Sequence, residues 1–394
     1  MTTGSRILLL SHAADNPNGG ASRVFHLLAQ GLEDLGHEVT LLHLEDMELP
    51  SNRVARLVAA RTLMPVLLDR AGRKQDPSAF DVVLSPSGLG YRLYDALKTS
   101  DHRPLLVNLI HGLAKYDHAA YMTESQLGHW LVTVPYRLVT GPAQVRWDDL
   151  GIKASDVTVV QNLRDLSDVR DTLGGEDRVR LIPPAVHPEL LDSSSDIVPP
   201  EDRAAAGILW FGTWEARKGA HHVPGAFREI RRSHPEATLT LGGTGKPEHE
   251  MREFFSPEDR SSVRVLPRIS NAEQAAIFNE SSIFLFPSLS EGFGLALAEA
   301  MCFGLAAVTT STAFGGDYLT DQVDARVVPP TSAHLSRAVV DLVEDPAKRS
   351  ALAARGRAIA RTFTLERSAA AYSKMFEDER ALSSRATTPS RKTF

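Results

Sequence analysis

The sequence has little cysteine and no long apolar run. Cys302 is the one cysteine in 394 residues, so an internal disulfide and a cysteine-based metal site are excluded, and nothing indicates an oxidising compartment. No stretch approaches the roughly 18 uncharged apolar residues that cross a bilayer. Only four apolar residues separate Arg6 from Ser11, too few for the core of a signal peptide. We therefore expect a cytoplasmic protein.

An excess of positive charge is also absent. Lysine and arginine number 43 against 49 aspartates and glutamates, a formal charge of −6. Nucleic-acid binding depends on clustered basic side chains that neutralise phosphates, so we expect no nucleic-acid partner. Hydrophobic residues make up 43% and charged residues 23%, as in ordinary globular proteins. At roughly 100–200 residues per domain, the length predicts two or three domains.

The chain does contain short apolar runs that alternate with longer amphipathic stretches. Continuous apolar runs are typical of strands buried on both faces, and helical stretches between them indicate a parallel sheet covered by helices. The fold class is therefore α/β, with two doubly wound, Rossmann-like halves. The predicted strands are residues 7–11, 38–42, 81–84, 105–109, 137–140, 157–160, 179–182, 208–211, 237–241, 263–266, 283–286, 306–309 and 325–328.

A polar, proline-bearing segment between residues 192 and 202 separates the two halves and predicts a linker. We predict domains at residues 1–200 and 201–382, with a last amphipathic helix at 365–382 and a tail at 383–394. Because ligands bind outside the carboxyl ends of the strands in open α/β sheets, two facing halves form a binding cleft.

The densest functional signal follows the predicted strand at 283–286. Gly292 and Gly294 let the backbone approach a ligand closely. A helix that begins near Gly294 would point its first N–H groups at a phosphate. Glu291 and Glu299 lie eight residues apart on either side of that helix start, so they can contact different parts of one extended ligand. The alternative is a strand-to-helix turn with a capping carboxylate.

A second signal lies at residues 211–219, after the first predicted strand of the second half. Lys218 beside Gly219 suits a diphosphate, because lysine acts as a point charge, and Arg217 adds a forked donor. Taken alone, this segment favours a solvated turn with ordinary surface charges.

Two weaker signals lie in the first half. Gly19 and Gly20 occupy the first strand-to-helix turn, but their surroundings lack the Gly-x-Gly-x-x-Gly spacing of a dinucleotide site. His111 follows the buried strand at 105–109 and precedes Gly112, which places it at the carboxyl edge of the sheet. A lone histidine is more often structural, and the strand-end position makes a catalytic role an equal alternative.

Together these pieces resemble the family-4 retaining glycosyltransferases of the GT-B fold. The resemblance covers nearly the whole chain. It rests most on the Glu-x7-Glu motif from Glu291 to Glu299, which contains Phe-Gly-Leu, and on the Gly-x4-Arg-Lys-Gly stretch at 212–219. The Pro-Pro turn within residues 182–186 and the segment 363–366 also match. In the family, the latter starts a final helix that crosses back to the first domain.

The resemblance implies an enzyme that transfers a hexosyl group from a nucleotide-diphosphate sugar to a hydroxyl of a small-molecule, glycan or lipid-linked acceptor. It implies an acceptor-binding first domain, a donor-binding second domain, no cofactor and no metal ion. Retention of configuration is described in this family as attack on the same face that the diphosphate leaves. The leaving phosphate oxygen takes the acceptor proton.

The resemblance also implies roles for single residues. Glu291 would face the transferred sugar, Lys218 would neutralise the diphosphate, and His111 would lie near the sugar and the acceptor. Glu299 would hydrogen-bond the nucleotide ribose. The other implied donor contacts are Gly20 at the phosphates, Phe293, Gly294 and Leu295 through their backbone, and Arg268 and Ile269 beside the base.

One departure from the family concerns the cations at the diphosphate. Many members carry an arginine directly after the first glycine of the second signal, where this chain has Thr213. Half of a two-cation clamp is therefore missing, and its replacement is either Arg217 or a cation from elsewhere in the chain. The Asp-x-Asp triplet with which other transferases hold a divalent ion does not occur in the sequence. The leaving-group charge then falls to Lys218 and helix N-termini.

A basic, partly apolar segment spans residues 53–74. A basic amphipathic helix can lie on an anionic membrane. The favoured interpretation is a helix with one core face and one solvated face, and the alternative is peripheral contact at the inner face of a membrane. The basic residues are Arg53, Arg56, Arg61, Arg70, Arg73 and Lys74.

Two other functions are kept as alternatives. A sugar-nucleotide epimerase would isomerise the donor without an acceptor. A glycosyltransferase-like binding subunit would bind the donor without turnover, and Thr213 is its one support. Contacts near Ile269 would read the donor base, and the sequence is compatible with UDP, GDP, ADP or dTDP.

Overall fold

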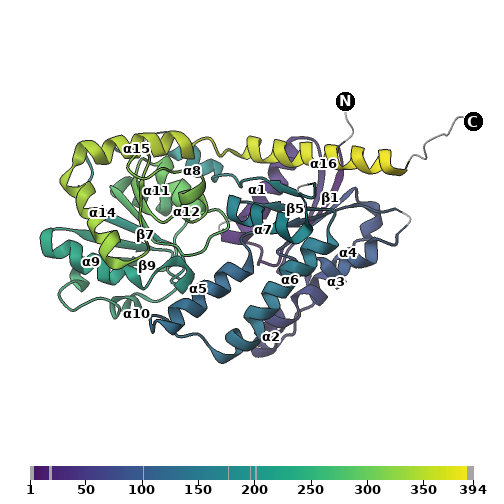
Figure 1. The fold of residues 1–394 in the computed structure, drawn as a ribbon, viewed down its shortest axis with the longest axis horizontal. Helices are drawn as coiled ribbons and strands as arrows, with labels where there is room; N and C mark the ends of the chain where they lie inside the picture. Colours follow the sequence, from purple (N-terminus) through teal and green to yellow (C-terminus); the bar gives the residue numbers. More distant parts are fainter. Residues whose placement is uncertain are drawn as a thin grey trace, which may run out of the picture.

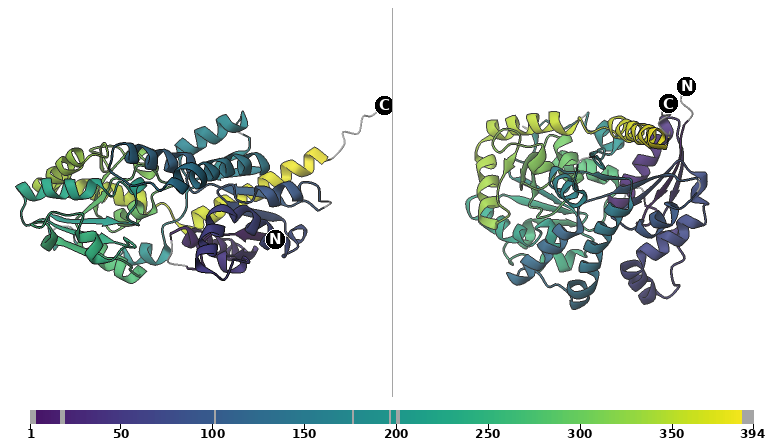
Figure 2. Two further views of the ribbon diagram at one scale, coloured as in Figure 1. Left: turned by 90° about the horizontal axis from the view of Figure 1, so that it is seen from below. Right: turned by 45° about the vertical axis from the view of Figure 1, so that its right-hand side comes forward.

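The computed structural model describes residues 4–16, 20–100, 102–175, 177–195, 197–199 and 202–387. These residues form two six-stranded parallel sheets with helices on both faces of each (Figure 1, Figure 2). The strand order is β2-β1-β3-β4-β5-β6 in the first sheet and β12-β11-β10-β7-β8-β9 in the second. The predicted pair of doubly wound α/β halves is confirmed.

The first sheet contains β1 (Arg6–Leu10), β2 (Glu38–Leu42), β3 (Val82–Pro86), β4 (Leu105–Leu109), β5 (Val157–Val160) and β6 (Val179–Leu181). The second contains β7 (Gly207–Phe211), β8 (Thr238–Gly242), β9 (Val263–Leu266), β10 (Ile283–Phe286), β11 (Ala306–Thr309) and β12 (Arg326–Val327). Strand order reverses between β1 and β3 in the first sheet and between β7 and β10 in the second. Such reversals open a crevice at the carboxyl edge of a sheet.

The helices of the first half are α1 (Gly20–Asp34), α2 (Arg53–Thr62), α3 (Met64–Arg73), α4 (Tyr91–Leu97), α5 (Ala114–Gln126), α6 (Gly141–Ala154), α7 (Leu163–Leu173) and α8 (Pro188–Ser193). Those of the second are α9 (His222–Ser233), α10 (Glu248–Arg252), α11 (Asn271–Glu280), α12 (Leu295–Cys302), α13 (Phe314–Asp317), α14 (Ser332–Glu344), α15 (Pro346–Ala360) and α16 (Leu365–Thr387).

Alternation along the strands builds a core on each side of each sheet. Ile7 and Leu9 of β1 pack in one apolar cluster with α1, whereas Leu8 and Leu10 pack in another cluster with α3 and α4. Successive side chains of a strand point to opposite faces. Because helices cover both faces of the sheet, the side chains on both faces are apolar. The sequence of the strand is therefore a continuous apolar run, without alternating polar residues.

The last helix belongs to the core of the first domain. In Figure 1, α15 lies over the second sheet and α16 runs on across the first. Tyr372 and Phe376 of α16 are buried in the cluster that contains α1. Gly31 lets the two helices approach, because a Cβ there would lie 2.7 Å from the Cβ of Ala369. Helix α16 thus links the second domain to the first.

Two details of the sequence prediction were wrong. Residues 137–140 are not a strand but part of a π-helical turn, Tyr136–Thr140, that continues into α6. Leu138 and Val139 are 65% and 54% exposed. The neighbours β4 and β5 pair directly with each other, so the sheet has no place for this run between them. Helix α16 extends to Thr387, into the predicted tail, where Arg385 and Ala386 are good helix formers. Residues 388–394 lie outside the described residues.

The basic segment divides into two helices with different exposure. Leu67 and Leu68 of α3 are buried against α4, which is the core face that the favoured interpretation expects. Helix α2 leaves Val54 and Val58 exposed at 69% and 54%. Among the described residues, none of the helices combines the length and the apolar character that crossing a bilayer demands.

Candidate functional site

The two domains meet through glycines at the carboxyl edges of their sheets. A Cβ on Gly292 would lie 2.2 Å from the carbonyl oxygen of His111, so no larger residue fits there. Gly112 has φ +104°, a conformation that glycine adopts freely. The Asn162 side-chain amide donates to the Gly292 carbonyl oxygen at 2.7 Å. The loop after β4 is therefore held directly against the loop after β10.

Glu291 and Lys218 form a buried ion pair at the crevice of the second sheet. Lys218 follows β7 and Glu291 follows β10, the two strands between which the order reverses. Lys218 Nζ donates to Glu291 Oε1 at 2.5 Å, and Ser288 Oγ donates to the same oxygen at 2.8 Å. The side chains are 16% and 7% exposed. Burial opposes ionisation of Glu291, but Lys218 and the cation of Arg217 outweigh it and lower the pKa of Glu291.

Arg217 brings a second cation to the same carboxylate. Its guanidinium lies 3.8 Å from Glu291 Oε2, 3.1 Å from Glu215 Oε2 and 3.9 Å from Asp117 Oδ2. Burial alone would lower the pKa of Arg217, but these three carboxylates outweigh burial and raise it. Thr213, by contrast, is exposed. The structure thus groups Arg217, and not Thr213, with Lys218 and Glu291.

Glu299 lies on α12 and is fully buried. Its Oε1 is 2.7 Å from Nη2 of Arg23 on α1, and its Oε2 accepts from the Gln274 side chain at 2.8 Å. Burial raises the pKa of Glu299 although Arg23 and Gln274 oppose this rise. In this state protein groups contact both carboxylate oxygens, and one of those groups comes from the other domain.

His111 is partly buried, two residues after the end of β4. Its ring packs edge to face on Phe25, with ring centres 5.3 Å apart. Burial, aided by repulsion from His12, lowers the pKa of His111 to about 4, although a hydrogen bond with Gln161 opposes the shift. Among the described residues, Nε2 of His111 has no hydrogen-bond partner.

The turn from β10 into α12 is shaped by Gly294, whose φ is +100°. The ring of Phe293 is buried among Phe314, Tyr318 and Phe363, and its carbonyl oxygen accepts from Phe314 N at 2.8 Å. Leu295 begins the helix. Because the Phe293 side chain points into the core, a ligand at this turn would contact backbone.

The remaining expected donor residues are Gly20, Arg268 and Ile269. Gly20 begins α1 and a Cβ there would contact nothing, while Gly19 lies outside the described residues. Arg268 is exposed and Ile269 packs against the apolar core beyond β9. Strand β9 is three strands from β10 in the sheet order, roughly 14 Å at about 4.8 Å per strand.

Several residues of the site could not be predicted from the sequence. Arg23 lies one helical turn after Gly20, and nothing in its local sequence indicates a partner in the other domain. Asp117 and Asn162 do not belong to any of the motifs recognised in the sequence. Ser288 lies three residues before the Glu-x7-Glu motif, in the loop after β10. A search for groups able to donate to Glu291 would therefore have found it.

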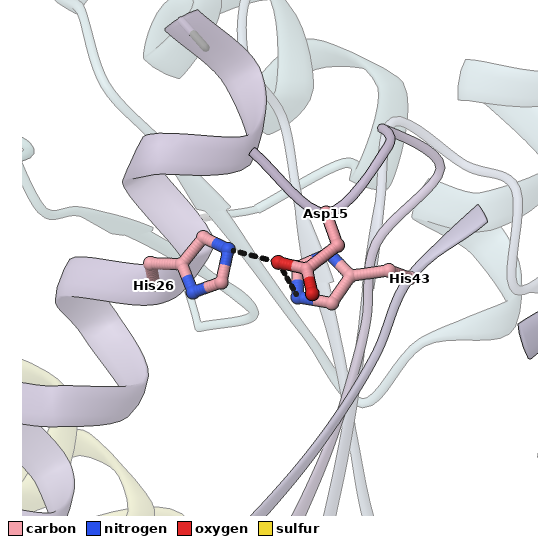
Figure 3. A group of neighbouring side chains, drawn as sticks. All are labelled: Asp15, His26 and His43. Atoms are coloured by element: carbon pink, nitrogen blue, oxygen red, sulfur yellow. Dashed lines mark ion pairs between the residues drawn. The ribbon is translucent and has the colours of Figure 1, made fainter. Parts of the chain in front are cut away.

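A group of two histidines and one aspartate lies at the carboxyl edge of β1 and β2. Figure 3 shows the imidazoles of His26 and His43 turned toward the Asp15 carboxylate. Asp15 Oδ1 lies 3.0 Å from His26 Nε2 and 3.6 Å from His43 Nε2. These atoms are of the kinds that bind divalent metals, although Asp15 itself is 59% exposed.

Comparison with known proteins gives a family match and partial relatives. Residues 201–359 match the model of Glycosyl transferases group 1. Glycogen synthase of Mycobacterium tuberculosis H37Rv is 30% identical over 160 residues, which are 39% of this chain and 38% of that protein. D-inositol 3-phosphate glycosyltransferase of Xylanimonas cellulosilytica is 27% identical over 290 residues, 68% of this chain and 64% of that protein. The chain thus spans less than two thirds of either relative.

Solved structures match over nearly the whole chain. Sucrose-phosphate synthase from Thermosynechococcus elongatus has a TM-score of 0.73 at 15% identity, covering 96% of this chain and all, 100%, of that one. WaaG, a glycosyltransferase involved in lipopolysaccharide biosynthesis, has a TM-score of 0.67 at 17% identity, covering 94% and 99%. The fold is therefore GT-B. Together with the match to Glycosyl transferases group 1, this fold supports the assignment of the chain as a GT-B glycosyltransferase.

Proposed function

We propose that the protein is a retaining glycosyltransferase that transfers a hexosyl group from a nucleotide-diphosphate sugar without a metal ion at the diphosphate. The observation that carries this proposal is the Glu291 carboxylate, held between Lys218 and Arg217 where the two domains meet. Two cations beside one carboxylate suit a ligand with an anionic part and a hydroxyl-rich part.

The sheet order supports an extended donor. The loops after β9, β8, β7 and β10 follow one another along a single edge, from Ile269 to Glu291. A nucleotide sugar laid along this edge would place its base near Ile269, its diphosphate at Lys218 and its sugar at Glu291. HepE from Anabaena, solved with UDP and glucose, has a TM-score of 0.63 at 14% identity over 95% of this chain and 100% of that one. UDP is accordingly the first nucleotide to test.

The proposed chemistry depends on the negative charge that develops on the leaving diphosphate. The diphosphate gains negative charge as it leaves, and fixed cations in a site shielded from water stabilise that charge most effectively. Lys218 and Arg217 supply the cations. The acceptor attacks from the face that the diphosphate leaves, and a phosphate oxygen takes its proton. His111, neutral at pH 7, would orient hydroxyl groups through its Nε2 and would not serve as a charged acid.

The ribose contact that the resemblance implies requires Glu299 to exchange its contact with Arg23 for one with the ribose. Arg23 lies against Glu299 in the present state. We infer that donor binding moves Arg23 aside so that ribose hydroxyls can donate to Oε1. The acceptor would lie against the first domain. The two relatives named above are a glycogen synthase and a D-inositol 3-phosphate glycosyltransferase, so a glycan or an inositol phosphate is the first class of acceptor to test.

Nucleotide binding tests the proposal without knowledge of the acceptor. UDP, GDP, ADP and dTDP are added separately to the purified protein and the melting temperature is measured. A nucleotide that binds the native state at 100 times its dissociation constant stabilises it by about 2.7 kcal/mol. We expect one base to raise the melting temperature above the others. A melting temperature that none of the four changes contradicts the proposal, as does conversion of the donor to an isomer without any acceptor.

A further inference from the structure

A second group of histidines lies between the two domains, apart from Glu291. Glu124 lies near the end of α5 in the first domain, and His129 follows it in the connection to α6. His221 and His222 lie at the start of α9 in the second domain. The catalytic loop with Lys218 ends just before this pair. Four side chains of metal-binding type thus converge from both sides of the domain boundary.

The ligand atoms of three of these four residues lie close enough to share one ion. Glu124 Oε2 is 2.8 Å from His129 Nδ1 and 2.7 Å from His221 Nε2. The ligand atoms of Glu124, His221 and His222 lie within 4.8 Å of one another. The ring centres of His129 and His222 are 5.7 Å apart. Zinc prefers ligand distances of 2.0–2.2 Å, so these three residues would close on the ion, and His129, which lies outside the 4.8 Å group, would rotate toward it.

Two members of the group are deeply buried, whereas the side chain of His129 is 45% exposed. The side chain of Glu124 is 7% exposed and that of His221 is 10% exposed. Among the described residues, Nδ1 of His221 has no hydrogen-bond partner. A buried polar atom without a partner is costly to the folded state.

The Asp15, His26 and His43 group of Figure 3 is the weaker candidate of the two. It offers three ligands and not four, and its carboxylate is 59% exposed. All three of its residues belong to the first domain. The interdomain group has three imidazoles and not two, and its carboxylate is buried.

We propose that Glu124, His129, His221 and His222 bind one divalent transition metal ion, most suitably zinc, as a closed four-coordinate structural site. Imidazole nitrogens and a carboxylate oxygen are zinc ligands, and four protein ligands leave no open position for catalysis. The ion ties α5 of the first domain to the start of α9, so it fixes how the first domain faces the loop that carries Arg217 and Lys218. It takes no part in charge stabilisation at the diphosphate.

Metal titration tests this site. The full chain, stripped with EDTA, is titrated with zinc alone and then with cobalt, whose visible absorption reports tetrahedral coordination. We expect one equivalent to bind at the interdomain group, with a rise in melting temperature. His221→Ala should weaken that binding at least about tenfold, and so should Glu124→Gln, which keeps the shape of the side chain if His221→Ala fails to fold.

The matched control is the pair His26→Ala and His43→Ala in the other group, which should leave that equivalent in place. Stoichiometry that survives His221→Ala and Glu124→Gln but is lost in the control pair overturns the proposal, as does the absence of binding at micromolar zinc. The readout needs no sugar transfer. Failure of the metal site and failure of the proposed activity are therefore distinguishable.

Discussion

Arg23 Nη2 lies 2.7 Å from Glu299 Oε1, and this buried contact joins α1 of the first domain to α12 of the second. The two side chains are 9% and 1% exposed. A buried pair of this kind stabilises little by its presence, but removal of one partner leaves an uncompensated charge. The contact therefore couples the stability of the domain interface to the ionisation of Glu299.

The first prediction concerns pH and Arg23→Met. Burial holds the pKa of Glu299 above its usual value, so the folded state binds this proton more tightly than the unfolded chain. Its contribution to stability is present at low pH and is lost as pH rises through the folded pKa. Without Arg23 the pKa rises further. We expect Arg23→Met to lower the free energy of unfolding by about 3–5 kcal/mol at pH 8, and by less at pH 5.

Chemical denaturation at the two pH values measures this difference. The control is the double variant Arg23→Met with Glu299→Gln, which removes both charges and should recover most of the loss at pH 8. A loss for Arg23→Met that is the same at pH 5 and pH 8 would show that Glu299 does not titrate as argued.

The second prediction compares the two candidates for the second cation. Arg217 lies 3.8 Å from Glu291 and Thr213 is exposed. Removal of one charge-stabilising group typically costs about 2.7–4 kcal/mol of barrier, or 10²–10³ in kcat. We expect Arg217→Ala to slow donor turnover by that factor and Thr213→Ala to change it less than about threefold. Steady-state kinetics at saturating donor decides the matter. A larger effect of Thr213→Ala would reverse the assignment.

The third prediction concerns His111. Its pKa is lowered to about 4 by burial, so the unfolded chain binds a proton near pH 6.5 that the folded protein does not. The stability from His111 is therefore present above pH 6.5 and is lost as pH falls toward 4. Between these values, His111→Asn should make the fall in unfolding free energy less steep by about 1.4 kcal/mol per pH unit. Denaturation curves at half-unit steps measure the slope.

The matched control for His111 is the exposed His102. Its substitution by asparagine should leave the slope unchanged. Equal slopes for the wild type and His111→Asn would mean that His111 is protonated in the folded protein.

The fourth prediction concerns the helix that links the domains. Phe376 of α16 is 1% exposed in the core of the first domain, whereas Leu382 of the same helix is 56% exposed. Loss of a buried aromatic side chain costs about 3–5 kcal/mol. We expect that loss for Phe376→Ala and less than about 0.5 kcal/mol for Leu382→Ala. Similar values for the two variants would place α16 off the core in solution.

Much of the architecture could be predicted from the sequence, because strands buried on both faces are continuous apolar runs. The predicted strand at 137–140 has apolar Leu138 and Val139 between Arg137 and Thr140, and the direct pairing of β4 with β5 excludes it from the sheet. Composition reports apolar character but not whether a neighbour is available. The same limit explains why the exposed Leu138 misled the prediction.

The residues of the site also divide into those that the sequence could predict and those that it could not. Lys218 and Glu291 could be found because each follows a strand and belongs to a recognisable motif. Their contact depends on β7 lying beside β10, a matter of strand order that one sequence does not state. Arg23 and Glu124 could not be found, since each acts through a partner in the other domain and neither lies in a motif.

The central claim is that Lys218 stabilises the charge of a departing nucleoside diphosphate at Glu291. The most direct measurement is the rate at which the purified protein releases nucleoside diphosphate from the nucleotide sugar whose base it binds, with wild type and Lys218→Met compared at saturating donor. The account predicts release by the wild type and a fall of about 10²–10³ in the variant, with the nucleotide still bound. Equal rates in the two folded proteins would contradict it.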